Sequence, residues 1–243
     1  MMPTNWLKPD WPAPVNVHAA TTLRSGGVSA GVYASLNPAT HVGDDHEYVQ
    51  QNRVLIRRML ALPSEPVWLE QVHGNAVVQA EQVTSLPAAD ASFSHAAGVV
   101  CTVLTADCLP VLFCTRDGQT VAAAHAGWRG LLAGVLRNTL AAMQASDVLV
   151  WLGPAIGARC FEVGAEVRAA FVQKNVQFAT AFIAQDATHY LADIYQLARI
   201  ELSTAGVCDI YGGGFCTVTE QERFFSYRRD KQTGRMATLI WRD

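Results

Sequence analysis

The sequence has few charged residues and no cluster of basic ones. Lysine, arginine, aspartate and glutamate make up 16% of the 243 residues, and the formal net charge is -3. Proteins whose affinity comes from the phosphates of nucleic acid usually carry a basic patch or stripe. We therefore expect no nucleic-acid partner.

Long apolar runs are also missing. The most apolar run, residues 97–106, is about half as long as the roughly 20 residues that a membrane helix needs. The first 22 residues contain no apolar core of a secretion signal, and prolines interrupt them repeatedly. These features predict a cytoplasmic protein that does not associate with membranes.

Cysteine pairs of the Cys-x-x-Cys type are absent, although the chain has six cysteines. In a long chain without an export signal, such cysteines are expected to be reduced thiols rather than disulfides. Their spacing also disfavours a structural zinc knuckle.

Half of the residues are hydrophobic, which is typical of a compact globular protein. Short apolar or β-branched segments bounded by glycine and proline predict strands over 15–22, 67–69, 99–105, 111–114, 121–124, 148–152, 207–211 and 236–241. Helical periodicity predicts helices over 47–60, 131–144, 163–172 and 194–205. Strands and helices neither alternate strictly nor form two blocks, so we expect an α+β fold with a mixed sheet. Without a linker or repeat, we predict one domain over 1–243, in which 1–14 is an N-terminal extension.

Three residues with metal-binding side chains share a position in this pattern. His73, Cys108 and His125 each follow a predicted strand or apolar segment and precede a turn. Imidazole and thiolate groups are good zinc ligands, and three of them leave one position open for water or substrate. The pattern thus indicates a catalytic zinc site. Because the three residues are far apart in sequence, ordinary roles in turns and in the core are the alternative.

A second reading of the same residues needs no metal. Cys108 would be a nucleophile activated by a nearby histidine and oriented by Asp107 or Gln71. Sequence spacing does not separate this reading from the metal site.

Arginines in two segments suggest anion binding. Arg129 lies in a Gly-Trp-Arg-Gly sequence between a predicted strand and a predicted helix, where free N–H groups and a guanidinium would bind phosphate. Arg228 and Arg229 lie among aromatic residues in 224–230, followed by Thr-Gly-Arg at 233–235, a mixture that suits a purine or a sugar phosphate. The alternatives are a tight turn with a packed tryptophan and an amphipathic edge strand with a charged hairpin.

Five blocks of sequence, in one order, resemble the YfiH-like family, also called laccase-domain or peptidoglycan editing factor proteins. They are WLEQVHG at 68–74, TADCLPV at 105–111, AAHAGWRG at 123–130, WLGPAIG at 151–157 and FSYRRD at 225–230. The resemblance runs from about Trp11 to the C-terminus. It implies an α/β/β/α layered fold and a metal-binding triad of His73, Cys108 and His125.

The resemblance implies three different activities. Members are described as purine nucleoside phosphorylases that also deaminate adenosine, as copper polyphenol oxidases, and as editing factors that remove L-serine from peptidoglycan precursors. Multicopper laccases use His-x-His motifs, and this chain has seven histidines without such a pair. Copper can still compete for a Cys/His site, because it binds most ligand sets more tightly than zinc does.

We predict a zinc-dependent purine nucleoside enzyme that phosphorolyses adenosine, inosine, guanosine and methylthioadenosine and deaminates adenosine. Asp107 or Glu70 would carry the proton, and Gln71 and the three arginines Arg129, Arg228 and Arg229 would bind nucleoside and phosphate. The expected state is a monomer or homodimer. The alternatives are a peptidoglycan editing amidase, a copper-dependent polyphenol oxidase and a non-catalytic metal-binding protein.

Overall fold

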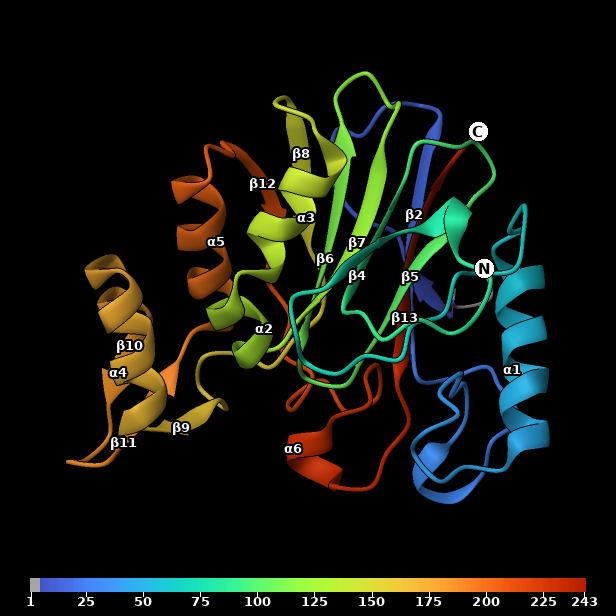
Figure 1. Cartoon of the computed structure of the whole chain (residues 1–243). Helices are drawn as coiled ribbons and strands as arrows, with labels where there is room; N and C mark the ends of the chain where they lie inside the picture. The colour runs from blue at the N-terminus through green and yellow to red at the C-terminus, as the bar shows by residue number, and fades with distance from the viewer. Residues whose placement is uncertain (1–4) are drawn as a thin grey trace.

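The computed structural model describes residues 5–243, which contain three β-sheets (Figure 1). The six-stranded sheet has the order β12-β8-β6-β7-β4-β3, with β3 Val77–Gln79, β4 Ala91–Ser94, β6 Leu109–Thr115, β7 Val121–Ala126, β8 Val148–Leu152 and β12 Asp209–Gly212. The four-stranded sheet has the order β1-β2-β13-β5, with β1 Trp6–Leu7, β2 Val17–Thr22, β5 Cys101–Thr105 and β13 Met236–Arg242. The small third sheet contains β9 Glu162–Gly164, β10 Phe182–Ala184 and β11 His189–Ala192.

Helices cover the outer faces of the two larger sheets. Three helices, α2 Trp128–Ala133, α3 Val135–Met143 and α5 Ile194–Thr204, lie beside the six-stranded sheet, and α1 His46–Met59 lies beside the four-stranded sheet (Figure 1). The remaining helices are α4 Ala165–Lys174, α6 Tyr227–Asp230 and the short 3-10 helices η1 Gly31–Tyr33, η2 Ala80–Gln82 and η3 Val176–Ala181.

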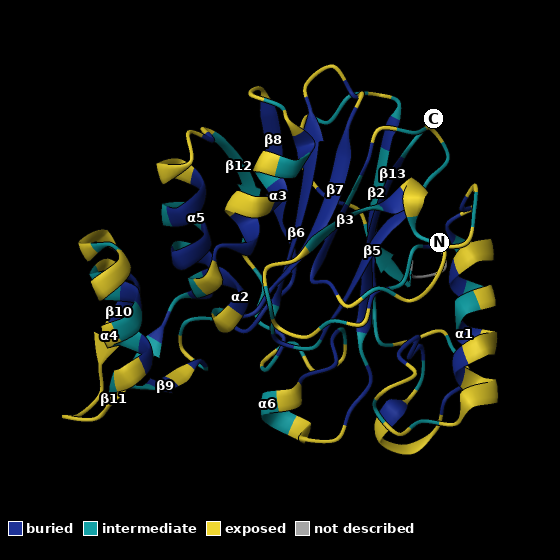
Figure 2. Ribbon diagram, viewed as in Figure 1, coloured by how far each residue is buried: buried dark blue, intermediate teal, exposed yellow. Residues whose placement is uncertain are grey.

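Side-chain alternation along the central strands explains this layering. In β6, Val111 and Phe113 belong to the core under the helices, whereas Leu112 and Cys114 belong to the core between the two sheets. A strand with apolar residues on both faces must be covered on both sides. The buried strands in the middle of Figure 2 show the result, and the predicted mixed α+β, α/β/β/α fold is confirmed.

Most predicted elements occur near their predicted bounds, and two predictions are wrong. The segment 67–69 is not a strand, because only Val67 bridges to Cys101. The predicted helix over 131–144 is two helices, since the chain turns at Gly134, which has a φ of +87°. The first of these helices already begins at Trp128. The strands β1, β3, β4 and β9 to β11, the helix α6 and the three 3-10 helices were not predicted.

Residues 6 and 7 belong to the four-stranded sheet. Trp6 and Leu7 of β1 pair with Thr22 and Thr21 of β2, so part of the predicted extension over 1–14 is a sheet edge. The predicted domain bounds remain a prediction.

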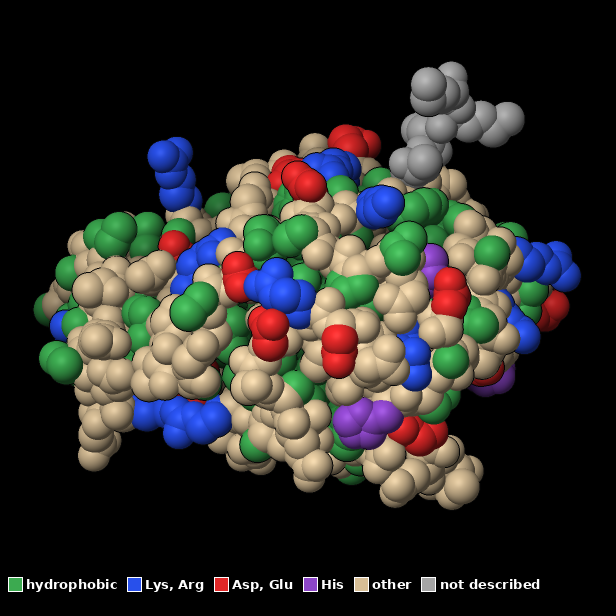
Figure 3. All heavy atoms as spheres, turned by 90° about the horizontal axis from the view of Figure 1, so that it is seen from above, with side chains coloured by type: hydrophobic (Ala, Val, Ile, Leu, Met, Phe, Trp, Pro, Cys, Tyr) green, Lys and Arg blue, Asp and Glu red, His purple; other side chains and the backbone are tan. Residues whose placement is uncertain are grey.

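Two observations concern possible large partners. Among residues 5–243, no helix has the length and apolar character to cross a membrane. On the face in Figure 3, lysine and arginine side chains lie among acidic and uncharged ones and do not merge into one patch.

The β6–β7 hairpin sets the position of the candidate site. In its antiparallel register Leu109 pairs with Ala126 and Pro110 with His125. Cys108, just before β6, therefore lies at the same end of the sheet as His125 near the end of β7. The connection from β5 to β6 and the start of α2 meet at this end.

Candidate metal centre

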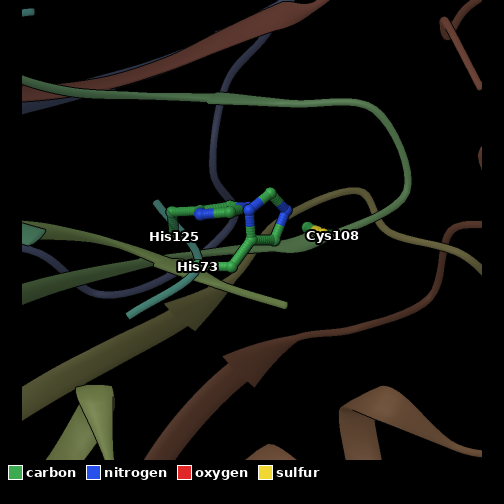
Figure 4. Close-up of side chains that lie close together, drawn as sticks. All are labelled: His73, Cys108 and His125. Atoms are coloured by element: carbon green, nitrogen blue, oxygen red, sulfur yellow. The ribbon is translucent and has the colours of Figure 1, made fainter. Parts of the chain in front are cut away.

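The structure brings the three predicted ligands together. The ligand atoms of His73, Cys108 and His125 all lie within 4.8 Å of one another (Figure 4). The two imidazole rings meet edge to face, with centroids 4.8 Å apart. His73 is exposed, Cys108 is half-buried and the His125 side chain is only 3% exposed, so the cluster opens toward solvent on one side.

Gly127 leaves the space that the cluster occupies. A Cβ atom at this position would lie 2.9 Å from Cys108 Sγ and 3.3 Å from His73 Cδ2. Any other residue would therefore push against two of the three ligands. Glycine is needed here for its size, since its φ of -68° is open to every residue.

Asp90, which directly precedes β4, accepts hydrogen bonds from both histidines. Its carboxylate accepts hydrogen bonds from His125 Nδ1 at 2.8 Å and from the backbone N–H groups of His73 at 2.9 Å and Gly74 at 2.6 Å. A carboxylate accepts only, so His125 Nδ1 carries the proton and Nε2 is free to bind a metal. The left-handed backbone of His73, with a φ of +60°, helps to aim successive N–H groups at one anion.

Asp90 is a site residue that the sequence patterns do not predict. It is one aspartate between two alanines before a short strand, and it carries no local motif. Its hydrogen bonds keep it ionised: burial would raise its pKa, but the bonds from His125, Gly74 and His73 lower the pKa below its ordinary value.

Charge also couples the ligands to one another. Burial would raise the pKa of Cys108, but the charges and hydrogen bonds of His125 and His73 lower it to about 6. Burial would likewise lower the pKa of His125, yet the Cys108 thiolate and Asp90 raise it to about 9. Without a metal, the pair is therefore thiolate and imidazolium near neutral pH. A metal cation held by these residues would replace the proton that makes His125 an imidazolium.

A cavity of about 350 Å³ opens beside the three ligands. Its volume lies at the lower end of the range for small-molecule sites, roughly 300–1,000 Å³. Besides the triad, the cavity is lined by three aromatic side chains, Trp128, Phe161 and Tyr227, and by three basic ones, His41, Arg228 and Arg235. Arg235 belongs to the segment noted in the sequence, whereas His41 had no signal there.

Two predicted residues, Gln71 and Asp107, line the cavity and also brace it. The Gln71 amide donates to the carbonyl of Leu104 at 2.8 Å and accepts from its N–H at 2.7 Å. Asp107 accepts from Thr217 Oγ1 and from the backbone N–H of Arg228, each at 2.6 Å. Asp107 thus ties the connection before β6 to the start of α6.

The three predicted arginines lie in three different surroundings. Arg228 lines the cavity, and its guanidinium donates to the carbonyl of Glu162 at 3.1 Å. Arg129 is exposed outside the cavity lining, with its guanidinium carbon 4.3 Å from the Trp128 ring centroid. Arg229 does not belong to the cavity lining.

The Arg229 guanidinium is already fully used. It donates to the carbonyls of Thr217, Val218 and Phe224 and forms an ion pair with Asp230 at 2.7 Å. The structure therefore brings only Arg228 of the three to the cavity. Glu70, the other predicted proton carrier, is exposed and does not belong to the lining.

The donor set suits zinc or copper. Two imidazoles and one thiolate match the nitrogen and sulfur ligands of zinc sites with one open position. The same set is also found around copper. Within residues 5–243 this is the single group of three or more potential ligands, which does not fit a cluster of several copper ions.

Comparisons with known proteins cover nearly the whole chain. The family model described as multi-copper polyphenol oxidoreductase laccase matches residues 18–243. The chain is 55% identical to the purine nucleoside phosphorylase YfiH of Escherichia coli (strain K12), over 97% of this chain and 98% of the relative. It is 53% identical to a protein of Pseudomonas aeruginosa with the same activity in its name, with the same coverage.

Solved structures agree with the sequence relatives. A Neisseria meningitidis protein superimposes with a TM-score of 0.95 at 52% identity, covering 98% of this chain and 99% of that one. YlmD from Geobacillus stearothermophilus superimposes with a TM-score of 0.91 at 32% identity, covering 100% and 97%. The chain therefore belongs to the YfiH/laccase-domain family.

Proposed function

We propose that this protein is a zinc-dependent enzyme of purine nucleosides, which phosphorolyses adenosine, inosine, guanosine and methylthioadenosine and also deaminates adenosine. The observation that carries the proposal is the full-length similarity, at 53% and 55% identity, to proteins named purine nucleoside phosphorylases. The cavity beside the triad provides a place for such a substrate. We further propose that the enzyme works in the cytoplasm, where its six free thiols stay reduced.

His73, Cys108 and His125 would hold the zinc ion, with Asp90 fixing the proton on the far side of His125. When bound, zinc would supply Lewis acidity at the one coordination position that the protein leaves open. Copper is the alternative metal for this donor set.

Aromatic side chains would bind the purine. Phe161, Trp128 and Tyr227 line the cavity, and stacking of a base on an aromatic ring is worth about 1–3 kcal/mol. The Arg228 guanidinium carbon lies over the Phe161 ring, 5.7 Å from its centroid, so a base bound beside this ring would lie near a cation. Gln71 would orient the substrate through the part of its amide not used by Leu104.

Asp107 would carry the proton in both reactions. It lines the cavity, whereas Glu70 does not. In phosphorolysis the carboxylate would take a proton from the attacking phosphate and give it to a purine ring nitrogen as the glycosidic bond breaks. In deamination it would take a proton from the attacking water and give it to the amino group, which leaves as ammonia. The hydrogen bonds from Thr217 and Arg228 hold the Asp107 carboxylate in place for this transfer.

The test offers the four nucleosides to the zinc-loaded protein with and without inorganic phosphate. We expect free base and a sugar 1-phosphate to appear with phosphate, and inosine to appear from adenosine without it. Cys108→Ala should abolish both reactions. The matched control Cys208→Ala changes an exposed cysteine outside the cavity and should keep full turnover.

Other outcomes identify other functions. If the protein released an L-serine peptide from a peptidoglycan precursor faster than it turned over nucleosides, its main function would be that of an editing amidase. Oxygen uptake with phenols in the copper-loaded form would make it a polyphenol oxidase. Inertness toward all three substrate classes with the metal bound would leave a metal-binding protein without catalysis.

A further inference from the structure

We propose that His41 and Arg235 form the phosphate-binding part of the cavity. This inference rests on the proposed phosphorolysis, which needs phosphate beside the nucleoside. It replaces Arg129 and Arg229, which the fold keeps out of the cavity, with two residues that line it. The residues come from opposite ends of the chain, and the fold joins their two loops.

Asn37 joins these loops. Its side-chain oxygen accepts from the backbone N–H of Arg235 at 3.0 Å and from that of Ala39 at 3.1 Å. Its side-chain nitrogen donates to the carbonyl of Ala39 at 3.2 Å and to Asp44 Oδ2 at 2.8 Å. All four hydrogen-bonding positions of this fully buried amide are therefore used, and they fix the loop that carries His41 against the one that carries Arg235.

A second contact joins the same two loops. Tyr33 donates its hydroxyl hydrogen to the carbonyl of Val42 at 2.7 Å, next to His41. The same hydroxyl accepts a bond from Gln232 Nε2 at 2.7 Å, three residues before Arg235. The backbones of the two loops are thus held together before any ligand arrives, and preorganisation of this kind lowers the entropic cost of binding.

Neither side chain has an acidic partner in the part of the chain from residue 5 onward. Arg235 Nη1 donates to the carbonyls of Thr233 and Gly234 in its own turn, at 2.9 and 3.0 Å, and Arg235 forms no ion pair with any residue from 5 to 243. The His41 side chain makes no hydrogen bond with these residues either. Arg229, in contrast, is paired with Asp230. The cavity therefore contains a cation whose charge the protein leaves available.

Burial makes this free cation costly without an anion. Burial lowers the pKa of Arg235, and the weaker effects of Cys108 and Asp107 oppose it. A partly desolvated guanidinium gains most from an anion that it can bind through two N–H groups, and phosphate presents such pairs of oxygens. The His41 ring can donate a further N–H to the same anion.

Arg228 suits the other substrate. Its guanidinium rests on the carbonyl of Glu162 and near the Phe161 ring, in the segment that we assign to the purine. The cavity would then hold nucleoside beside Phe161 and phosphate beside Arg235, and the triad contributes to the same cavity.

The experiment measures inorganic phosphate binding to the zinc-loaded protein by calorimetry, without nucleoside. Arg235→Gln and His41→Gln should each raise the phosphate Kd, by about tenfold or more for Arg235→Gln, because a charge-assisted hydrogen bond is lost. Arg235→Lys, which keeps the charge and loses the planar fork, should be intermediate. Arg57→Gln is the matched control, since Arg57 is exposed on α1 and outside the cavity.

Kinetics supply a separate readout. In Arg235→Gln and His41→Gln the KM for phosphate should rise by a larger factor than the KM for adenosine in the deamination reaction, which uses water and no phosphate. His41→Gln decides the outcome if Arg235→Gln fails to fold, because the His41 side chain makes no hydrogen bond with any residue from 5 to 243.

The outcomes separate the site from the proposed function. Phosphate binding by the wild type that is unchanged in both variants would overturn the site, and so would absence of binding in the wild type. If both variants lose binding while the wild type cleaves no nucleoside, the anion site stands and the proposed phosphorolysis fails. If nucleoside cleavage requires phosphate but the KM for phosphate is the same in the wild type and in all variants, the proposed phosphorolysis stands and the proposed phosphate site is wrong.

Discussion

Asp90 Oδ1 accepts a hydrogen bond from His125 Nδ1 at 2.8 Å, and the same oxygen accepts the backbone N–H of His73 at 2.9 Å. One buried carboxylate oxygen thus contacts both histidines of the candidate metal centre. The side chain of one histidine and the backbone of the other are therefore positioned by a residue that is not itself a ligand.

Replacing Asp90 should weaken metal binding and stability together. Asp90→Ala leaves His125 Nδ1 and the N–H groups of His73 and Gly74 without their acceptor. We expect the free energy of unfolding to fall by about 3–5 kcal/mol. Zinc affinity should fall about 10- to 100-fold, as is usual when a metal ligand loses its supporting partner. Urea unfolding and competition with a chelator measure the two effects.

Asp90→Asn refines this test. The amide keeps the shape of the carboxylate but points an N–H₂ group at one of the donors, so zinc affinity should still fall. Asp10→Asn is the control, because Asp10 is exposed outside the cavity. Unchanged zinc affinity in both Asp90 variants would show that Asp90 does not position the ligands.

Gly127→Ala should disturb the cluster through one methyl group. The new Cβ would lie 2.9 Å from Cys108 Sγ, so the thiolate or the helix start has to move. We expect zinc affinity to drop by about tenfold or more. Gly214→Ala is the matched control, since a Cβ there meets no atom within 4 Å. Equal zinc affinity in the two variants would contradict the packing argument.

Cys108 should react as a thiolate in the metal-free protein at mildly acidic pH. Its pKa of about 6, compared with the ordinary 9.0, means that the thiol predominates below about pH 6 and the thiolate above it. Alkylation by iodoacetamide, located by peptide mass spectrometry, should therefore rise with a midpoint near pH 6.

The buried thiols of Cys101 and Cys114 serve as internal comparisons, because burial raises the pKa of each to about 12. They should stay unmodified over the same range. Zinc should protect Cys108 at every pH at which the metal remains bound. A midpoint near pH 9 for Cys108 would show that the histidines do not stabilise its thiolate.

One zinc ion should be found per chain, because the described residues offer one cluster of three ligands. His73→Ala, Cys108→Ala and His125→Ala should each abolish tight binding, as measured by elemental analysis after dialysis. Their costs in stability should differ: His73 is exposed, whereas His125 is buried and bonded to Asp90. A stoichiometry of two or more, or full binding after loss of one ligand, would exclude the shared site.

Local patterns predicted much of the fold, because the central strands and helices bury apolar faces that can be read from periodicity. The break at Gly134 was missed since a glycine within a helical pattern does not by itself show that its φ is positive. For the triad, the position of each residue after a strand or apolar segment left ordinary roles in turns and in the core as alternatives, and the family resemblance favoured the metal site. The approach of the three residues to one another depends on the register of β6 and β7, which the sequence does not state.

The different surroundings of the arginines could not be predicted from the sequence. Arg228 and Arg229 are neighbours on α6, and successive helical residues point in directions about 100° apart. Arg228 lines the cavity, whereas the Arg229 guanidinium donates its hydrogen bonds to carbonyl groups outside the lining. The roles of Asp90 and His41 follow from contacts between segments that are distant in the sequence. No local motif around either residue indicates these contacts.

The position of β13 has a consequence for how the chain folds. The last strand lies between β2 and β5, two strands from the first half of the sequence, and pairs with both. Until residues 236–242 have been synthesised, the edges of β2 and β5 that pair with β13 remain unpaired. Unpaired strand edges are the sites at which unfinished chains aggregate. Loss of this strand would therefore expose two edges in the interior of the sheet, and a chain without residues 236–242 should aggregate more readily than one that has them.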